Sequence, residues 1–354
     1  MRNRTIKAIC IGEDFEGKGI VKEGGQEFHI PNLIEGEVAK IEILRTGKFQ
    51  HARLMGLYEK SKYRASPPCP YYGACGGCQI QHMTALGQAY FKQRCVEKLL
   101  KKYHKVNDIL VMDQPYYYRH KINSTPSYDK RMRIVSGIYQ EYTHRVVPVE
   151  SCMIQDRAAD EIIASILRIM RLQKLKPYDE DTGGGFLRHI LIRTGFFSRQ
   201  VMVVLVVSSP IFPGKNNFVN SLLKMHPEIT TIVMNVNNRK TSIVLGGSEK
   251  VLYGRGYIED MLCGCVFQIS PRSFYQVNPM QTEILYNSAI GIANLNGNET
   301  VLDAYCGIGT ISLILSGRVK RVIGVELNRD AVRDAIRNAK RSGITNASFY
   351  NDDA

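Results

Sequence analysis

The spacing of hydrophobic and polar residues changes twice along this 354-residue chain. Residues 1–58 hold short alternating runs separated by glycines, a pattern typical of short strands that close into a small β-barrel. The expected strands are Thr5–Ile11, Gly19–Lys22, Gln26–Ile30 and Glu37–Leu44. Basic residues are spread over the same stretch, namely Lys40, Arg45, Lys48 and Arg53. A small basic barrel is a common grip for single-stranded RNA, and the pattern favours that role and a purely structural one about equally.

A helix is predicted after Thr84, because apolar residues recur there at helical spacing. Residues 116–261 have a mixed α and β pattern, with a helix that Asp156 caps and that ends near Leu175. The expected strands of this stretch are Leu187–Thr194, Gln200–Val207, and a hairpin of Ile229–Val236 with Thr241–Leu245. Of these, Gln200–Val207 is apolar enough for burial on both faces of a sheet.

Strand and helix patterns alternate from Glu299 onward, which predicts βαβ units on a parallel sheet. The expected strands are Thr300–Ala304, Arg321–Glu326 and Ala347–Asn351, and the expected helices are Ile308–Ser316 and Arg329–Arg341. A doubly wound sheet normally has more strands, yet the chain ends at Ala354, directly after the third strand. We therefore expect this domain to be incomplete.

The first of these strands leads into the glycine turn Asp303-Ala304-Tyr305-Cys306-Gly307-Ile308-Gly309-Thr310. Glycines let a ligand approach the backbone, and the N-terminus of the next helix favours negative charge. Glu326 ends the second strand, where a carboxylate can accept hydrogen bonds from both ribose hydroxyls of a nucleoside. Ser312 occupies the third glycine position of the dinucleotide pattern G-x-G-x-x-G, which favours S-adenosylmethionine over NAD. An ordinary tight turn is the weaker interpretation, since acidic residues end both strands.

Three cysteines lie within ten residues as Cys69-x5-Cys75-x2-Cys78, and Cys152 is the natural fourth ligand. Four thiolates suit a [4Fe–4S] cluster or a structural zinc ion, and the spacing alone does not decide between them. Radical S-adenosylmethionine chemistry uses C-x3-C-x2-C, which this spacing does not match. Cys306 lies inside the glycine turn, where we expect it to pack rather than to act as a nucleophile. Small buried side chains are expected of Cys10, Cys95, Cys263 and Cys265.

The formal net charge of +14, from 47 basic and 33 acidic residues, favours a polyanionic partner. Aromatic and basic residues are interleaved in Tyr116-Tyr117-Tyr118-Arg119-His120-Lys121, which favours nucleic acid. The N-terminal sequence lacks the apolar stretch of a secretory signal, and no run approaches the length of a membrane span. We therefore expect a cytoplasmic protein with reduced cysteines and no membrane partner. We also expect a monomer.

These features follow one order along the chain: basic barrel, C-x5-C-x2-C loop, distant fourth cysteine, and cofactor turn with the pattern D-x-x-C-G-x-G. Just before the turn stands Ser270-Pro271-Arg272-Ser273-Phe274-Tyr275-Gln276-Val277-Asn278. In this combination the chain resembles the RNA 5-methyluridine (uracil-C5) methyltransferase family, particularly its iron–sulfur branch acting on 23S ribosomal RNA. The resemblance covers essentially the whole chain and implies a multidomain α/β protein. Its domains would be a TRAM-type, OB-like RNA-binding barrel at 1–58, a central α+β iron–sulfur domain at 59–83 and 113–272, and a Rossmann-like methyltransferase domain at 84–112 and 273–354.

The resemblance also implies which residues form the site. Phe274 would stack on the flipped-out target uracil. The [4Fe–4S] cluster would be held by Cys69, Cys75, Cys78 and Cys152. Binding of S-adenosylmethionine is implied for Gln276, Asp303, Tyr305, Gly307, Gly309, Thr310, Glu326 and Asp353. Each has a plainer alternative: Phe274 as core, Gln276 as a turn residue and Asp353 as a solvated strand end.

The chemistry of the family needs residues that these 354 positions lack. Uracil C5 is a weak nucleophile, so such enzymes add a cysteine thiolate to C6, and a base later removes the C5 proton. In the family this cysteine, a glutamate base and an Asp-Pro-Pro-Arg segment follow the third strand, and none of them appears here. We therefore expect no turnover, which a tritium-release assay on uridine-labelled ribosomal RNA tests. The alternatives are a non-catalytic RNA-binding iron–sulfur protein and a tRNA substrate, although the cysteine loop favours ribosomal RNA.

Overall fold

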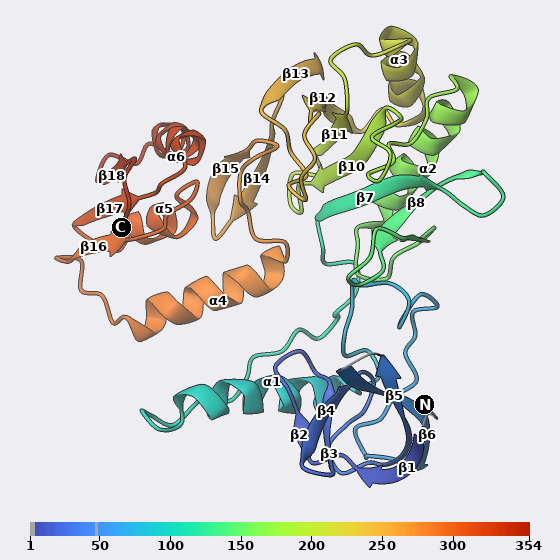
Figure 1. Cartoon of the computed structure of the whole chain (residues 1–354). Helices are drawn as coiled ribbons and strands as arrows, with labels where there is room; N and C mark the ends of the chain where they lie inside the picture. Colours follow the sequence, from blue (N-terminus) through green and yellow to red (C-terminus); the bar gives the residue numbers. More distant parts are fainter. Residues whose placement is uncertain (1–3, 47–48) are drawn as a thin grey trace. The chain divides into compact units, whose positions relative to one another are not determined.

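The computed structural model describes residues 4–46 and 49–354, so Lys48, one of the basic residues expected on the barrel, lies outside the described residues. The chain divides into two compact units (Figure 1). Unit 1 contains residues 1–113 and 140–143, and unit 2 contains residues 114–139 and 144–354. In the part of the chain that the structure describes, no helix combines the length and apolar content needed to cross a bilayer.

Unit 1 contains two antiparallel three-stranded sheets. The first has the order β1-β5-β6, with β1 (Arg4–Ile9), β5 (Val38–Thr46) and β6 (Phe49–Glu59). The second has the order β2-β3-β4, with β2 (Gly12–Glu13), β3 (Gly19–Glu23) and β4 (Gln26–Ile30). Side chains of both sheets, among them Val21, Ile30 and Ile41, share one buried core. Four of the strands match expectations within a few residues, whereas β2 and β6 had no expected counterpart.

The helix predicted after Thr84 is α1 (Ala85–Leu100), and the Thr84 hydroxyl caps it by accepting a hydrogen bond from Gly87 N at 3.1 Å. Helix α1 lies in unit 1, where Tyr90 stacks on Tyr63 with ring centroids 5.2 Å apart. The sequence-based division assigned residues 84–112 to the C-terminal domain and residues 59–83 to the central domain, and its bounds remain predictions.

Unit 2 is built on a seven-stranded sheet with the order β13-β12-β11-β10-β7-β8-β9 (Figure 1). Its strands are β7 (Lys121–Tyr128), β8 (Ile134–Tyr139), β9 (Val146–Pro148), β10 (Leu187–Thr194), β11 (Val201–Val207), β12 (Ile229–Val236) and β13 (Ser248–Tyr253). All neighbouring pairs are antiparallel except β11 and β12. Every residue of β11 is buried, which confirms the expectation of burial on both faces.

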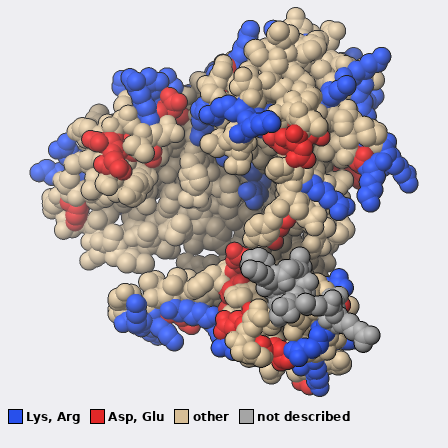
Figure 2. All heavy atoms as spheres, in the orientation of Figure 1, with Lys and Arg blue, Asp and Glu red and all other residues tan. Residues whose placement is uncertain are grey.

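The two faces of this sheet pack against different layers. One face is covered by α2 (Arg157–Leu172) and α3 (Lys215–Met225). The other packs against the hairpin of β14 (Ile258–Leu262) and β15 (Cys265–Ile269) and against the C-terminal helices. Lys and Arg side chains are frequent on the part of unit 2 that holds α2 and the β7–β8 hairpin (Figure 2).

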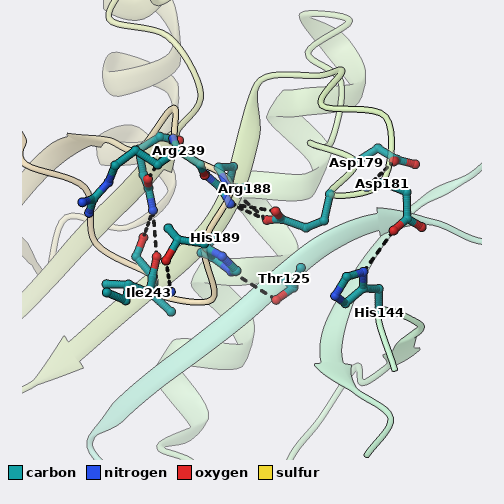
Figure 3. Close-up of polar contacts among 12 residues, drawn as sticks. Thr125, His144, Asp179, Asp181, Arg188, His189, Arg239 and Ile243 are labelled. Carbon is teal, nitrogen blue, oxygen red and sulfur yellow. Dashed lines mark hydrogen bonds and ion pairs between the residues drawn. The ribbon is translucent and has the colours of Figure 1, made fainter. Parts of the chain in front are cut away.

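The buried Arg188 anchors a polar network at the end of β10 (Figure 3). Its guanidinium forms an ion pair with Glu180 at 2.7 Å and donates hydrogen bonds to the backbone oxygens of Asn237 and Arg239 at 2.7 and 2.8 Å. A buried charge is tolerated only when it is paired and hydrogen-bonded, so this network ties the loop before β10 to the loop after β12.

The alternation expected from Glu299 onward is confirmed. A parallel sheet has the order β16-β17-β18 and is joined by helices. The elements are α4 (Pro279–Ile292), β16 (Thr300–Asp303), α5 (Thr310–Ser316), β17 (Arg321–Val325), α6 (Arg329–Arg341) and β18 (Ala347–Tyr350). The expected hairpin was wrong in one strand: β12 pairs with β13 (Ser248–Tyr253), and Thr241–Leu245 is not a strand. The chain is therefore a mixed α/β protein.

Candidate functional site

The glycine turn joins β16 to α5 and requires glycine for two reasons. Gly307 and Gly309 have φ angles of +55° and +80°, in the left-handed region that other residues rarely adopt. A Cβ on Gly309 would lie 3.1 Å from the Phe349 ring and 3.2 Å from the Ala335 Cβ. A Cβ on Gly307 would meet nothing within 4 Å. Gly309 is thus packed closely against Phe349 and Ala335, whereas the backbone at Gly307 borders open space.

Glu326 directs its carboxylate at this turn. Its Oε2 accepts a hydrogen bond from Gly307 N at 3.1 Å, and its Oε1 accepts one from Asn328 N at 2.7 Å. The strand register places these groups together, because Cys306 N donates to Val325 O at 3.0 Å. A carboxylate lies beside the open space next to Gly307 as a result.

Asp303, at the end of β16, is a second carboxyl group near the turn. It accepts a hydrogen bond from Ser312 Oγ at 2.5 Å. Burial raises the pKa of Asp303, and the nearby Glu326 carboxylate raises it further, against the lowering effect of Ser312. Ser312 is fully buried and therefore links α5 back to the strand from which the turn departs.

The other turn residues differ in exposure. Tyr305 is 77% exposed, whereas Cys306 is buried. Burial, with the carboxylates of Asp303 and Glu326, raises the pKa of Cys306 to about 12. The thiol is therefore protonated at neutral pH and unsuited to nucleophilic attack. Thr310 Oγ1 lies 3.3 Å from Tyr286 Oη, which connects α5 to α4.

The segment with Phe274 and Gln276 precedes α4, and hydrogen bonds to the rest of unit 2 fix its backbone. Phe274 is 67% exposed, so the alternative of a core residue is wrong. The Ser273 hydroxyl donates to Asp334 Oδ2 on α6 at 2.8 Å, and His120 Nε2 lies 2.6 Å from Gln276 O. An exposed aromatic ring thus stands on a fixed backbone, tied to the helix that follows Glu326.

Helix α6 contributes a second tie that sequence reasoning missed. Asn338 Oδ1 accepts from Gln268 N at 2.8 Å, and its Nδ2 donates to Ile308 O in the glycine turn at 3.2 Å. Asp334 and Asn338 are four residues apart and both buried, on the face of α6 that also buries Ala335. Polar residues on an otherwise apolar helix face were the available signal.

Asp353 is exposed, and its backbone N donates to Asp352 Oδ1 at 2.9 Å. The structure therefore gathers Asp303, Gly307, Gly309 and Glu326 tightly, with Thr310 beginning the adjoining helix. Asp353 follows β18, the strand paired with β17.

The predicted metal ligands are distributed over both units. Cys69, Cys75 and Cys78 belong to unit 1, and Cys152 belongs to unit 2. Cys75 and Cys78 line a cavity of about 270 Å³ within unit 1. Among residues 4–46 and 49–354, no group of three or more His, Cys, Asp or Glu side chains is arranged to hold a metal ion.

The remaining cysteines only partly meet expectations. Cys10 is buried, and its Sγ donates to Gly12 O at 3.2 Å. Cys95, Cys263 and Cys265 are only partly buried, contrary to the expectation for them. Burial nevertheless raises the pKa of Cys263 and of Cys265, so neither is an activated thiol.

Known proteins are similar to this chain in sequence and in fold. Residues 295–354 match the family model of a methyltransferase domain. The chain is 39% identical to an uncharacterized RNA methyltransferase of Halalkalibacterium halodurans over 359 residues, which cover 100% of this chain and 78% of that protein. It is 38% identical to an uncharacterized RNA methyltransferase of Bacillus cereus over 354 residues, which cover 98% of this chain and 77% of that protein.

A solved structure has a similar fold over most of the chain. The Pyrococcus abyssi tRNA (uracil-54, C5)-methyltransferase, in complex with S-adenosyl-L-homocysteine, superimposes with a TM-score of 0.77. The match covers 97% of this chain and 78% of that chain at 22% identity. At that identity the similarity concerns the fold.

Proposed function

Since the chain belongs to the RNA methyltransferase family, we propose that its activity is the S-adenosylmethionine-dependent methylation of uridine C5 in 23S ribosomal RNA. The observation that carries the cofactor assignment is the Glu326 carboxylate, which accepts a hydrogen bond from Gly307 N at 3.1 Å beside an open backbone. When bound, S-adenosylmethionine supplies an electrophilic methyl group.

The residues of the turn fit such a cofactor. Glu326 would hold the ribose hydroxyls, Gly307 would allow close approach, and Gln276, Asp303 and Tyr305 would complete the site. Gly309 and Thr310 would shape the start of α5, and Asp353 would lie near the adenine. None of the thiols near the turn is assigned as nucleophile, because burial raises the pKa of Cys306 to about 12.

Phe274 is proposed to stack on the target uracil. A base must leave its stack before its C5 can be reached, and an aromatic ring stabilises the extruded base. The 67% exposure of Phe274 and its backbone anchors support this role. Residues 1–58 are proposed as a TRAM-like RNA-binding barrel, and the net charge of +14 supports an RNA partner.

The [4Fe–4S] cluster on Cys69, Cys75, Cys78 and Cys152 remains a proposal with sequence support alone. The described side chains do not fit a metal ion, since no group of three ligands is suitably arranged. Iron and sulfide analysis after anaerobic purification tests it. Zinc without iron would remove the assignment.

Binding of S-adenosyl-L-homocysteine, measured by calorimetry, tests the cofactor site without requiring turnover. We expect Glu326→Gln to weaken binding about ten- to a hundredfold, because hydrogen bonds to charged groups contribute about 1.5–3 kcal/mol. Glu161→Gln, at an exposed position of α2, is the matched control and should bind as the wild type does. Failure of the wild type to bind would contradict the proposal.

Methyl transfer from tritiated S-adenosylmethionine to 23S ribosomal RNA and to tRNA tests the substrate. Incorporation at uridine C5 of ribosomal RNA supports the proposed substrate and overturns the expectation that these 354 residues have no turnover. A preference for tRNA would replace ribosomal RNA with the second candidate, the substrate of the P. abyssi enzyme. Binding of both RNA and S-adenosyl-L-homocysteine without transfer would favour a non-catalytic role for this chain.

A further inference from the structure

A cavity of about 390 Å³ lies in unit 2 between helix α2 and the strands β7 and β8. This volume falls within the range of small-ligand pockets, roughly 300–1,000 Å³. Its floor comes from the sheet, through Ser124, Ile134 and Ser136, and its roof comes from α2, through Ala164 and Leu167. No residue of the proposed cofactor turn lines it.

The floor of this cavity contains two serine hydroxyl groups. Ser124 and Ser136 are 6% and 4% exposed, and both line the cavity. A serine hydroxyl can both donate and accept a hydrogen bond. The cavity is therefore equipped to hydrogen-bond an occupant.

Charged groups of opposite sign lie at the two ends of the cavity. Arg171 Nη1 donates to Ile134 O at 3.3 Å at the start of β8. Arg133, the residue before Ile134, also lines the cavity and forms an ion pair with Asp129 at 2.7 Å. Asp160 stands three turns of α2 away, and its Oδ2 accepts from Cys152 N at 2.9 Å. The helical rise separates residues 160 and 171 by about 16 Å along the axis. One end thus suits an anion and the other suits hydrogen-bond donors.

We propose that this cavity binds one nucleotide of the RNA, extruded from its neighbours, at a second site in addition to the target uridine. The phosphate would lie at Arg133 and Arg171, and the base would lie between the apolar side chains, facing Ser124 and Ser136. Basic residues are frequent on this part of unit 2 (Figure 2), which favours approach of the RNA backbone. The inference rests on the proposed function only in taking RNA as the ligand.

The acidic end of the cavity selects among the bases. A carboxylate accepts hydrogen bonds and donates none, so Asp160 favours a base with adjacent donors. Guanine offers two such donors on its Watson–Crick edge, whereas uracil offers one. Guanine is therefore the expected base.

Filling the cavity tests the inference directly. Ala164 is exposed on α2 at the mouth of the cavity, so Ala164→Trp places an indole there without disturbing the buried face of the helix. Ser136→Leu fills it independently from the floor. Ala289→Trp, at an exposed position of α4 outside the cavity, is the matched control.

Two measurements are read together. In saturation-transfer NMR with the four ribonucleoside monophosphates, wild type and Ala289→Trp should bind guanosine monophosphate best, and both cavity variants should lose it. In anisotropy titrations with a labelled single-stranded RNA containing guanine, the cavity variants should bind about tenfold more weakly, the scale of one lost base contact. Asp160→Asn should abolish the preference for guanine.

The outcomes separate this inference from the proposed function. Cavity variants that bind both the nucleotide and the RNA as the wild type does would overturn the nucleotide site and leave the methyltransferase assignment intact. Binding of no ribonucleotide by the wild type would also overturn it. A wild type that binds S-adenosyl-L-homocysteine but no RNA would instead contradict the proposed function.

Discussion

Replacing Gly309 with alanine tests the structural reason for the glycine turn. Gly309 is the N-cap of α5, with φ +80° and ψ +25°. For a residue with a Cβ, the left-handed conformation costs about 1–2 kcal/mol. The new Cβ would also lie 3.1 Å from the Phe349 ring and 3.2 Å from the Ala335 Cβ, so these neighbours must shift by tenths of an ångström. Together the two effects predict a loss of about 2–3 kcal/mol in the free energy of unfolding.

Urea unfolding followed by circular dichroism measures this loss, since the chain contains no tryptophan. The matched control is Gly317→Ala at the other end of α5. Gly317 has φ −74°, and a Cβ there would meet nothing within 4 Å. That substitution should be neutral or stabilise by up to about 1 kcal/mol. Equal stabilities of the two variants would refute the argument from backbone conformation and crowding.

Two further predictions concern buried charges. Burial raises the pKa of Asp303 above its ordinary value of 3.8, so the folded protein holds this proton more tightly than the unfolded chain does. The contribution of Asp303 to the free energy of unfolding should therefore fall as pH rises from 3.8 through the raised pKa, and Asp303→Asn should become more stable relative to wild type over that window in a pH series of urea unfolding. Glu180→Gln leaves Arg188, which has 0% side-chain exposure, without its counter-charge and should destabilise the protein by about 3 kcal/mol in the same assay. Asp181→Asn, whose partner His144 is exposed, is the control and should change little; a similar loss in both variants would contradict the argument.

The sequence predicted the C-terminal elements well, because their hydrophobic patterns reflect burial. Strand β11 is buried throughout, and the alternating elements of β16 to β18 each pack one face. The missed strand β13 shows the opposite case. Ser248–Tyr253 is largely exposed, and its first three residues are polar, so it lacks the pattern of a core strand. Val244 and Leu245 lie in a loop and pack against the core, so their apolar side chains gave the loop the pattern of a strand.

The candidate site likewise contains contacts that the sequence predicted and contacts that it did not. Glu326 was predicted from its place at the end of an apolar strand, and its carboxylate does contact the glycine turn. Ser312 was noticed only for not being glycine, whereas it donates to Asp303 at 2.5 Å. This pairing depends on the angle at which α5 leaves the turn, which no spacing rule supplies. The prediction of a four-cysteine site has the same limit, because sequence spacing does not give the distance between residues 78 and 152.

Helix α6 explains how two parts of the proposed site keep a fixed relation. Its N-cap Asn328 donates its backbone N–H to Glu326, so the carboxylate proposed for the ribose is anchored where the helix begins. Six residues further along the same helix, Asp334 accepts from Ser273, next to the proposed stacking residue Phe274. A methyl transfer needs the donor and the acceptor carbon held in line within a narrow range of positions. Because one helix anchors both the cofactor side and the base side, its packing rather than either loop determines that alignment.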